Sequence, residues 1–295
     1  MTSNERTSQT PGVSPARHAA RAVTSTWWLA LKLALKPQYL LNLPSNYAWM
    51  VMRRKYDAFT TDRAYDERPS SWLGPLGWWA DRRVLNFPLH VSLRHRLRFV
   101  TESLVEQITG RRERGVRPVR VLSAPSGLCR DLIQTADELR RRDPSLLEQV
   151  EFHVLDIDFQ GDVIPEARRR MEAAAVPVTF YREDIFDPTG LTARSRAGMK
   201  FQVVNCIGLT AWLTLEEIEK LVGFFRQVVM EPGSILLIDN FAWHQHSAMG
   251  EDLEIYTSYH PPEAFAQVIT RAGFEPVEEK ATPSGVNTLS IVRAK

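Results

Sequence analysis

The chain has 295 residues, of which 44% are hydrophobic and 24% are charged, and its formal net charge is +2. This composition is that of an ordinary globular protein and excludes fibrous or wholly disordered classes. Two cysteines cannot build a disulfide framework, and no CxxC or Cys/His cluster indicates a structural metal. We therefore expect a cytoplasmic protein without a bound metal.

Charge is distributed unevenly along the chain. Residues 1–118 carry 19 basic and 9 acidic side chains, whereas residues 119–295 carry 18 basic and 26 acidic ones. A basic front half suits an acidic substrate, a membrane surface or nucleic acid. Complementary packing between the two halves of one protein explains the asymmetry equally well.

The first 20 residues lack apolar periodicity, so we expect a flexible tail over 1–20. The apolar run TWWLALKLAL at 26–35 follows too late for a secretory signal. It is also far shorter than the roughly 20 residues that a membrane span needs. Peripheral contact with a membrane through this run, as an interfacial helix, stays open.

Residues 21–117 are predicted to form a helical cap. A helix is expected over 22–60, ending or kinking at Pro37 and Pro44, and a clearer one begins near residue 94 and stops at Gly110.

Six of the eight tryptophans fall within residues 27–79. The stretch 69–79, with two prolines and two glycines, is expected to be a loop. These aromatics either form a small core of their own or roof a pocket for an apolar or planar substrate.

From residue 118 to the C-terminus, short β-rich runs alternate with amphipathic helices, which is typical of β-α-β units. The predicted strands are 119–124, 152–157, 178–183, 201–207 and 234–241, and the predicted helices are 128–142, 162–174, 215–229 and 262–272. Thr214 and Glu217 form a capping box for the third helix. The last two segments, FEPVEEKA and NTLSIVRA, predict a hairpin. We expect a doubly wound, mostly parallel, seven-stranded Rossmann-like α/β sheet with an antiparallel C-terminal hairpin.

Ligands of such sheets bind at the carboxyl ends of the strands, where the strand order reverses. Small residues follow the first predicted strand as SAPSG, 123–127, and let the backbone approach a ligand closely. Asp156 follows the second strand and Asp184 the third, and a neutral stretch at 205–209 ends the fourth. A carboxylate in the position of Asp156 can accept both hydroxyls of a ribose.

This order of turn, acid, acid and neutral platform, followed by a terminal hairpin, resembles the class I S-adenosylmethionine-dependent methyltransferases over about 118–295. The resemblance implies S-adenosylmethionine as cofactor. Ser123, Ala124 and Gly127 would contact its methionine part, Asp156 its ribose and Asp184 its adenine. Cys206 and Ile207 would flank the cofactor, and Ile157 and Ile185 are further expected contacts. Two positions depart from the family pattern, because the first turn lacks its acid and the fourth strand begins with Gln202 rather than an acid.

Structural roles compete for the same residues. Asp156 is also suited to cap the following helix. Asp184 is close enough in sequence to pair with Arg182. Cys206 suits a small core position better than the role of a nucleophile.

The methyl acceptor is expected beside the segment that follows the fifth strand. His244 and His260 are the candidate general bases, since a histidine titrates near neutral pH. Tyr47, Trp243, Tyr256 and Tyr259 are expected to shape the acceptor pocket. His244 and His246 lack a third ligand, so no metal is predicted.

The sequence thus predicts methyl transfer to a small molecule with an apolar or aromatic body, such as a natural-product or lipid-like metabolite. Nucleic acid is not expected as partner, because motifs that resemble those of base methyltransferases are absent. Two alternatives remain: an RNA or protein methyltransferase that uses the basic front half, and a non-catalytic binding protein of the same fold. The oligomeric state is not predicted.

Overall fold

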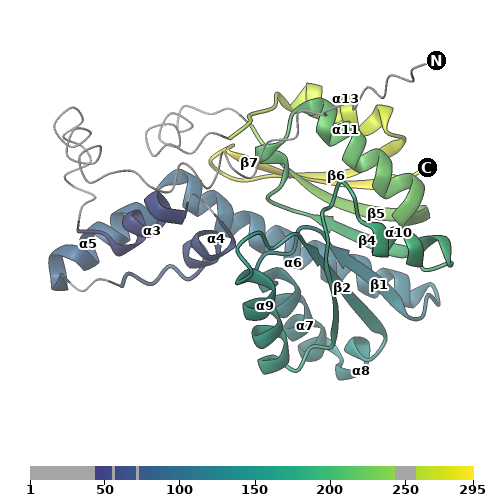
Figure 1. The fold of residues 1–295 in the computed structure, drawn as a ribbon, viewed down its shortest axis with the longest axis horizontal. Coiled ribbons are helices and arrows are strands. Elements are labelled where there is room, and N and C mark those ends of the chain that lie inside the picture. Colours follow the sequence, from purple (N-terminus) through teal and green to yellow (C-terminus); the bar gives the residue numbers. More distant parts are fainter. Residues whose placement is uncertain (1–43, 55–56, 71–72, 243–256) are drawn as a thin grey trace, which may run out of the picture.

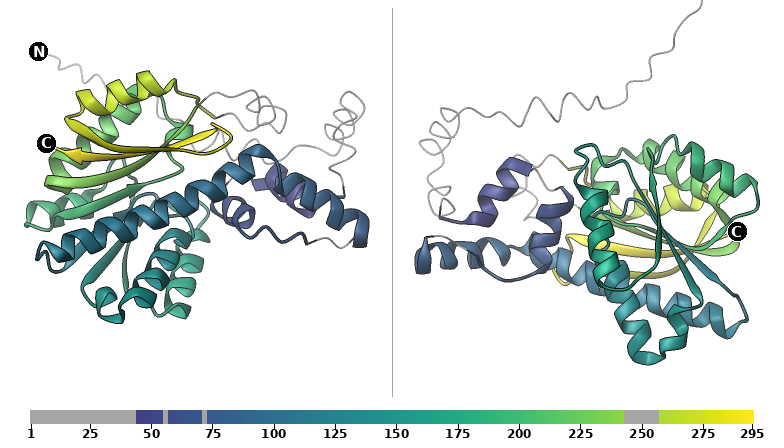
Figure 2. Two further views of the ribbon diagram at one scale, coloured as in Figure 1. Left: turned by 180° about the vertical axis from the view of Figure 1, so that it is seen from behind. Right: turned by 60° about the horizontal axis from the view of Figure 1, so that its bottom comes forward.

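The computed structural model describes residues 44–54, 57–70, 73–242 and 257–295. The predicted tail, the apolar run at 26–35, and the candidate residues Trp243, His244 and Tyr256 lie outside these ranges. Helices on two faces enclose one sheet, and a helical segment extends from its side (Figure 1; Figure 2).

A single seven-stranded sheet organises the molecule, in the order β3-β2-β1-β4-β5-β7-β6. Its strands are β1 (Val119–Ser123), β2 (Val150–Asp156), β3 (Val178–Arg182), β4 (Phe201–Cys206), β5 (Met230–Phe241), β6 (Phe274–Ala281) and β7 (Asn287–Ala294). β7 pairs antiparallel with both β5 and β6, and the other pairings are parallel. The predicted doubly wound sheet with an antiparallel hairpin is confirmed.

Each face of the sheet is covered by helices. On one face lie α10 (Thr189–Arg196), α11 (Leu215–Phe224) and α13 (Pro262–Arg271), and on the other lie α6 (Pro88–Glu113), α7 (Arg130–Arg142), α8 (Pro144–Leu147) and α9 (Val163–Ala173). Strand side chains alternate between the two cores, as Leu122 and Val121 of β1 do. The predicted capping box of Thr214 and Glu217 begins α11.

The N-terminal helices pack at the carboxyl edge of the sheet. α3 (Asn46–Arg54), α4 (Ala58–Tyr65) and α5 (Gly74–Leu85) share a third apolar cluster with Leu93 of α6, Phe241 at the end of β5 and Val286 of the β6–β7 turn. This cluster places α4 and the first turns of α6 over the strand ends (Figure 2).

Two local predictions were wrong. The stretch containing Trp78 and Trp79 is part of helix α5 rather than a loop, because Gly74 and Pro75 occupy its first turn, where proline is tolerated. α6 begins at Pro88, before residue 94, and passes through Gly110 without stopping. The predicted helix 215–229 is confirmed: it runs as α11 to Phe224 and continues as a π-helix over Phe225–Val229.

Candidate functional site

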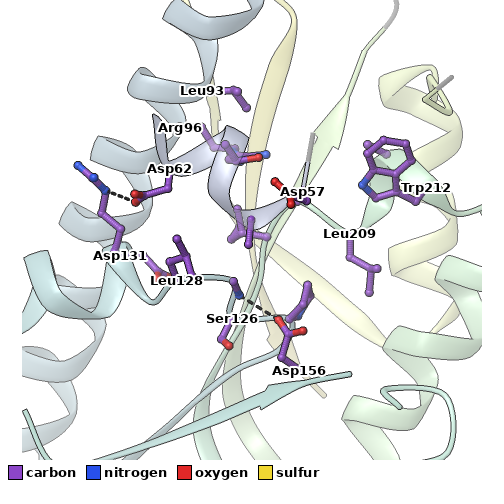
Figure 3. Close-up of a pocket in the computed structure, with 18 of the residues that line it drawn as sticks. Asp57, Asp62, Leu93, Arg96, Ser126, Leu128, Asp131, Asp156, Leu209 and Trp212 are labelled. Atoms are coloured by element: carbon purple, nitrogen blue, oxygen red, sulfur yellow. Dashed lines mark hydrogen bonds and ion pairs between the residues drawn. The ribbon is translucent and has the colours of Figure 1, made fainter. Parts of the chain in front are cut away.

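A cavity of about 420 Å³ opens at the carboxyl ends of β1, β2 and β4, where the strand order reverses. Its walls come from the β1–α7 turn, the loop after β2, the segment after β4, and helices α4 and α6 (Figure 3). The volume is within the range of small-molecule sites. The cavity therefore occupies the place where open α/β sheets bind ligands.

The turn after β1 brings backbone close to this cavity. Gly127 lines it in a left-handed conformation, φ +49, and a Cβ at this position would lie 3.5 Å from the Cβ of Ala58 in α4. Ser123 and Ala124 are fully buried and do not line the cavity, contrary to the predicted cofactor contact. Only the last part of SAPSG, from Pro125 on, therefore faces a ligand.

Asp156 lines the cavity at the end of β2. Its Oδ2 accepts a hydrogen bond of 3.1 Å from the backbone N–H of Gly127, and its Oδ1 accepts one of 3.0 Å from that of Asp158. Burial raises the pKa of Asp156. Helix α9 is capped by Asp158 instead, which accepts from the N–H groups of Val163 and Ile164, so Asp156 is not that helix's cap.

The other predicted cofactor residues divide into two groups. Ile157 and Ile207 line the cavity. Asp184 is exposed, accepts a hydrogen bond from the backbone of Phe186 and does not line the cavity, so its predicted contact is not supported.

Ile185 and Cys206 are core residues and also lie outside the cavity lining. Burial raises the pKa of the Cys206 thiol, which fits the packing role already considered for it.

Asp131 is another of the carboxylates on the cavity wall, and the sequence did not single it out. It stands in the first turn of α7, where Asn205 at the end of β4 donates a hydrogen bond to its Oδ2. The same Asn205 amide contacts Ser123 Oγ at 3.2 Å. Burial raises the pKa of Asp131 to about 6.

A buried ion pair forms part of the opposite wall. Arg96 of α6 lines the cavity, and its Nη1 donates to Asp239 Oδ2 over 2.6 Å while its Nη2 donates to the hydroxyl of Tyr65 over 3.0 Å. Asp239 Oδ1 accepts from the backbone N–H of Gly208 at 2.9 Å. Burial lowers the pKa of Arg96, but Tyr65 and Asp239 outweigh it and the pKa is raised.

Further ion pairs hold α4 over the cavity. Asp62 lies 2.5 Å from Nε of Arg130 in α7 and 2.7 Å from Nη1 of Arg170 in α9. Asp66 accepts from the same Arg130 at 2.6 Å. Arg54 of α3 reaches Asp162 beside α9 over 2.9 Å. We call these six residues, Arg54, Asp62, Asp66, Arg130, Asp162 and Arg170, the clasp, because they join the N-terminal helices to α7 and α9.

The predicted acceptor residues are only partly gathered here. Tyr259 lines the cavity. Tyr47 does not: it is 1% exposed and donates to the carbonyl of Thr60, which makes it a core residue of the cap. His260 is buried outside the cavity lining with Nε2 3.3 Å from the carbonyl oxygen of Thr210, so it is not positioned as a general base.

Apolar side chains make up most of the wall near α6. They are Leu89, Leu93, Leu97, Val100, Leu209, Trp212, Phe241 and Val286. Among the described residues, no three His, Cys, Asp or Glu side chains are grouped to hold a metal ion. None of the helices in the described ranges is long and apolar enough to cross a bilayer.

Comparison with solved structures identifies the fold. A possible exported protein from Bordetella parapertussis superposes with a TM-score of 0.60 at 17% identity, over 81% of this chain and 79% of that one. The magnesium protoporphyrin IX methyltransferase of Synechocystis PCC 6803 with bound S-adenosylhomocysteine superposes with a TM-score of 0.51 at 12% identity. The match covers 71% of this chain and 88% of that one. The S-adenosylmethionine-dependent methyltransferase SibL superposes with a TM-score of 0.51 at 16% identity, over 95% of this chain and 77% of that one. No protein-family model and no curated protein matches the sequence.

Proposed function

We propose that this protein, whose fold is that of the class I methyltransferases, transfers a methyl group from S-adenosylmethionine to a small molecule with an apolar or aromatic body. The observation that carries the proposal is a pair of carboxylates, Asp131 and Asp156, on the cavity wall at the strand-order reversal. In the described part of the chain neither one has an arginine or lysine within ion-pair distance. Two such carboxylates suit a cationic ligand.

The residues present fit that cofactor. S-adenosylmethionine carries a sulfonium and an ammonium group, and Asp131 would hold the ammonium while Asp156 would accept the ribose hydroxyls. Ile157 and Ile207 would pack against the adenine. Gly127, which has no side chain, would let the methionine part approach the backbone closely, while its N–H holds Asp156 in place.

When bound, the cofactor supplies a methyl group activated by its sulfonium. Charge is consumed during the transfer, so the protein contributes mainly by aligning the acceptor and excluding water. The apolar wall and the overlying α4 serve both purposes here. An acceptor that carries a proton passes it to solvent or to a base, and His244, outside the described residues, is the remaining histidine candidate.

The acceptor half of the cavity supports the proposed substrate class. Leucine, valine and aromatic side chains from α6, η2 (Thr210–Trp212) and β5 surround it. A hydrophobic wall with few polar groups selects compounds by shape and apolar area. Selectivity for the acceptor would therefore come from the N-terminal helices.

The test is calorimetric titration of the full chain with S-adenosylmethionine and S-adenosylhomocysteine. We expect micromolar binding that is lost in Asp156→Ala and kept in Asp137→Ala, an exposed carboxylate of α7 whose partner is Arg140. Absence of binding by folded wild-type protein, or binding unchanged in Asp156→Ala, would overturn the proposal.

A further inference from the structure

Arg96 has more hydrogen-bonding capacity than the protein uses. A guanidinium has five N–H donors, and two of these bond to Asp239 and Tyr65. The Nε–H is buried and has no partner within the described ranges, although Arg96 is only 3% exposed. An unmet buried donor costs free energy. The Nε atom itself is enclosed by protein, so the donors left for a ligand on this cavity-lining residue are the second N–H groups of Nη1 and Nη2.

Tyr65 adds a second donor at the same place. Its hydroxyl oxygen accepts from Arg96 Nη2 at 3.0 Å, and no residue of the described chain accepts the Tyr65 hydroxyl hydrogen. Tyr65 also lines the cavity. A ligand oxygen between the two residues can therefore accept hydrogen bonds from both.

The charge of this wall favours a neutral oxygen over an anionic one. Asp239 already neutralises Arg96 and is itself 0% exposed. A ligand carboxylate would leave a net negative charge against an apolar wall, in a cavity that also contains Asp131 and Asp156. A carbonyl oxygen adds no charge and meets the unused donors.

The surroundings define the rest of the ligand. Leu93, Leu97 and Val100 flank Arg96 on α6 and line the cavity, and the Phe241 ring lies 5.7 Å from the guanidinium carbon. A polar group amid apolar walls fixes orientation while the walls provide contact area.

We propose that the acceptor subsite takes a neutral, apolar molecule whose carbonyl oxygen accepts hydrogen bonds from Arg96 and Tyr65. The inference rests on the proposed methyl transfer and specifies its acceptor. Arg96 and Tyr65 are positioning residues, because they orient the acceptor and do not receive the methyl group.

Binding of matched probes to the S-adenosylhomocysteine-saturated protein tests the subsite. The probes are 2-acetylnaphthalene, its hydrocarbon analogue 2-isopropenylnaphthalene, and 2-naphthoate. We expect the ketone to bind about tenfold more tightly than the hydrocarbon, the range for a hydrogen bond to a charged group, and more tightly than the carboxylate.

The informative variant is Arg96→Met combined with Asp239→Asn, which removes the ion pair without leaving a lone buried charge. Ketone affinity should fall several-fold towards that of the hydrocarbon, the remainder coming from Tyr65, while hydrocarbon affinity stays unchanged; a collapsed pocket would weaken both. Arg111→Met is the matched control, since Arg111 is a buried arginine of the same helix with an unpartnered Nε, away from the cavity. If the double variant does not fold, Tyr65→Phe replaces it, with a loss of several-fold expected for the ketone alone.

Four outcomes would overturn the subsite. In the wild type these are equal affinity for ketone and hydrocarbon, no affinity for either, and tighter binding of the carboxylate. In the variants it is a ketone preference that is not reduced. S-adenosylhomocysteine binding is measured separately in every sample. Its absence from the wild type would instead overturn the proposed function.

Discussion

Replacing Asp131 by asparagine should make the protein more stable and a poorer cofactor binder. The carboxylate stands on the cavity wall and receives one hydrogen bond from Asn205, with no cation paired to it within the described residues. Burial raises its pKa from 3.8 to about 6, so at neutral pH the folded protein holds a charge that it disfavours. Asp131→Asn keeps an acceptor oxygen and removes that charge.

The size of the effect follows from the shift in pKa. A change from 3.8 to about 6, at about 1.4 kcal/mol per unit, corresponds to about 3 kcal/mol. Part of the side chain faces the open cavity, so we expect a gain of about 1–2 kcal/mol. An acid with a raised folded-state pKa is stabilising when protonated; this stabilisation is complete below pH 3.8 and is lost as the pH rises through about 6.

Urea unfolding of wild type and Asp131→Asn at pH 5 and pH 8 is the assay. The variant's advantage should be largest at pH 8 and smaller by about 1 kcal/mol at pH 5, where the wild-type carboxyl is mostly protonated. Its affinity for S-adenosylmethionine should fall at pH 8. A stability gain that is the same at both values, or a loss at pH 8, would refute the reasoning.

Two further predictions concern stability. Asp62→Asn should lower the free energy of unfolding by about 2 kcal/mol at low salt and by less at high salt, because the one carboxylate pairs with both Arg130 and Arg170. A change below about 0.5 kcal/mol in a urea titration would contradict a role for the clasp. Burial lowers the pKa of His90 and His153 to about 4. As the pH falls from 6.5 to 4, the unfolded chain therefore takes up protons that the folded chain does not, and each histidine should lower the free energy of unfolding by up to about 3 kcal/mol. Urea midpoints across that range check this, and a flat profile in the Asp131→Asn background would argue against it.

The sheet could be predicted from sequence because its signals are local and repeated. Runs such as 201–206 and 234–241 are mostly apolar and alternate with helices, which leaves few possible topologies. Helix α5 could not be predicted from the sequence, since Gly74, Pro75 and Gly77 are also residues that indicate a loop. In the fold, Gly77 is buried against neighbouring helices. Tertiary packing decides such cases.

The site was predictable only where side chains follow strand ends. Asp156, Ile157 and Ile207 occupy that position and line the cavity, whereas Asp184 follows a strand that lies two places from β1. Arg96 left a trace in the sequence: it falls in the stripe formed by Leu93, Leu97 and Val100, where a charge signals a buried partner. No local pattern, however, pairs it with Asp239, 143 residues away.

Asp131 shows how the departure at the first turn is compensated. The class I methyltransferase pattern places an acid at the strand end where this chain has Ser123, and Asn205 bridges Ser123 to Asp131. The negative charge thus reaches the cavity from the first turn of α7, where a helix N-terminus also favours it. An altered motif is consequently weak evidence for a lost cofactor site, because the charge requirement can be met by a residue that the motif does not include.

The 26 residues of α6 couple the two halves of the cavity. Its first turns pack in the cap cluster through Leu93, and its later turns pack against β1 and α7 through Val100 and Leu104. Arg96 lies between these regions and faces the cavity. Since one continuous helix spans both regions, the apolar wall near α6 cannot shift relative to the strand ends without bending α6 or breaking contacts at one end. The contacts of α4 with the strand edge depend instead on the partly exposed clasp, so we expect ligand affinity to respond to salt through the clasp rather than through the buried Arg96.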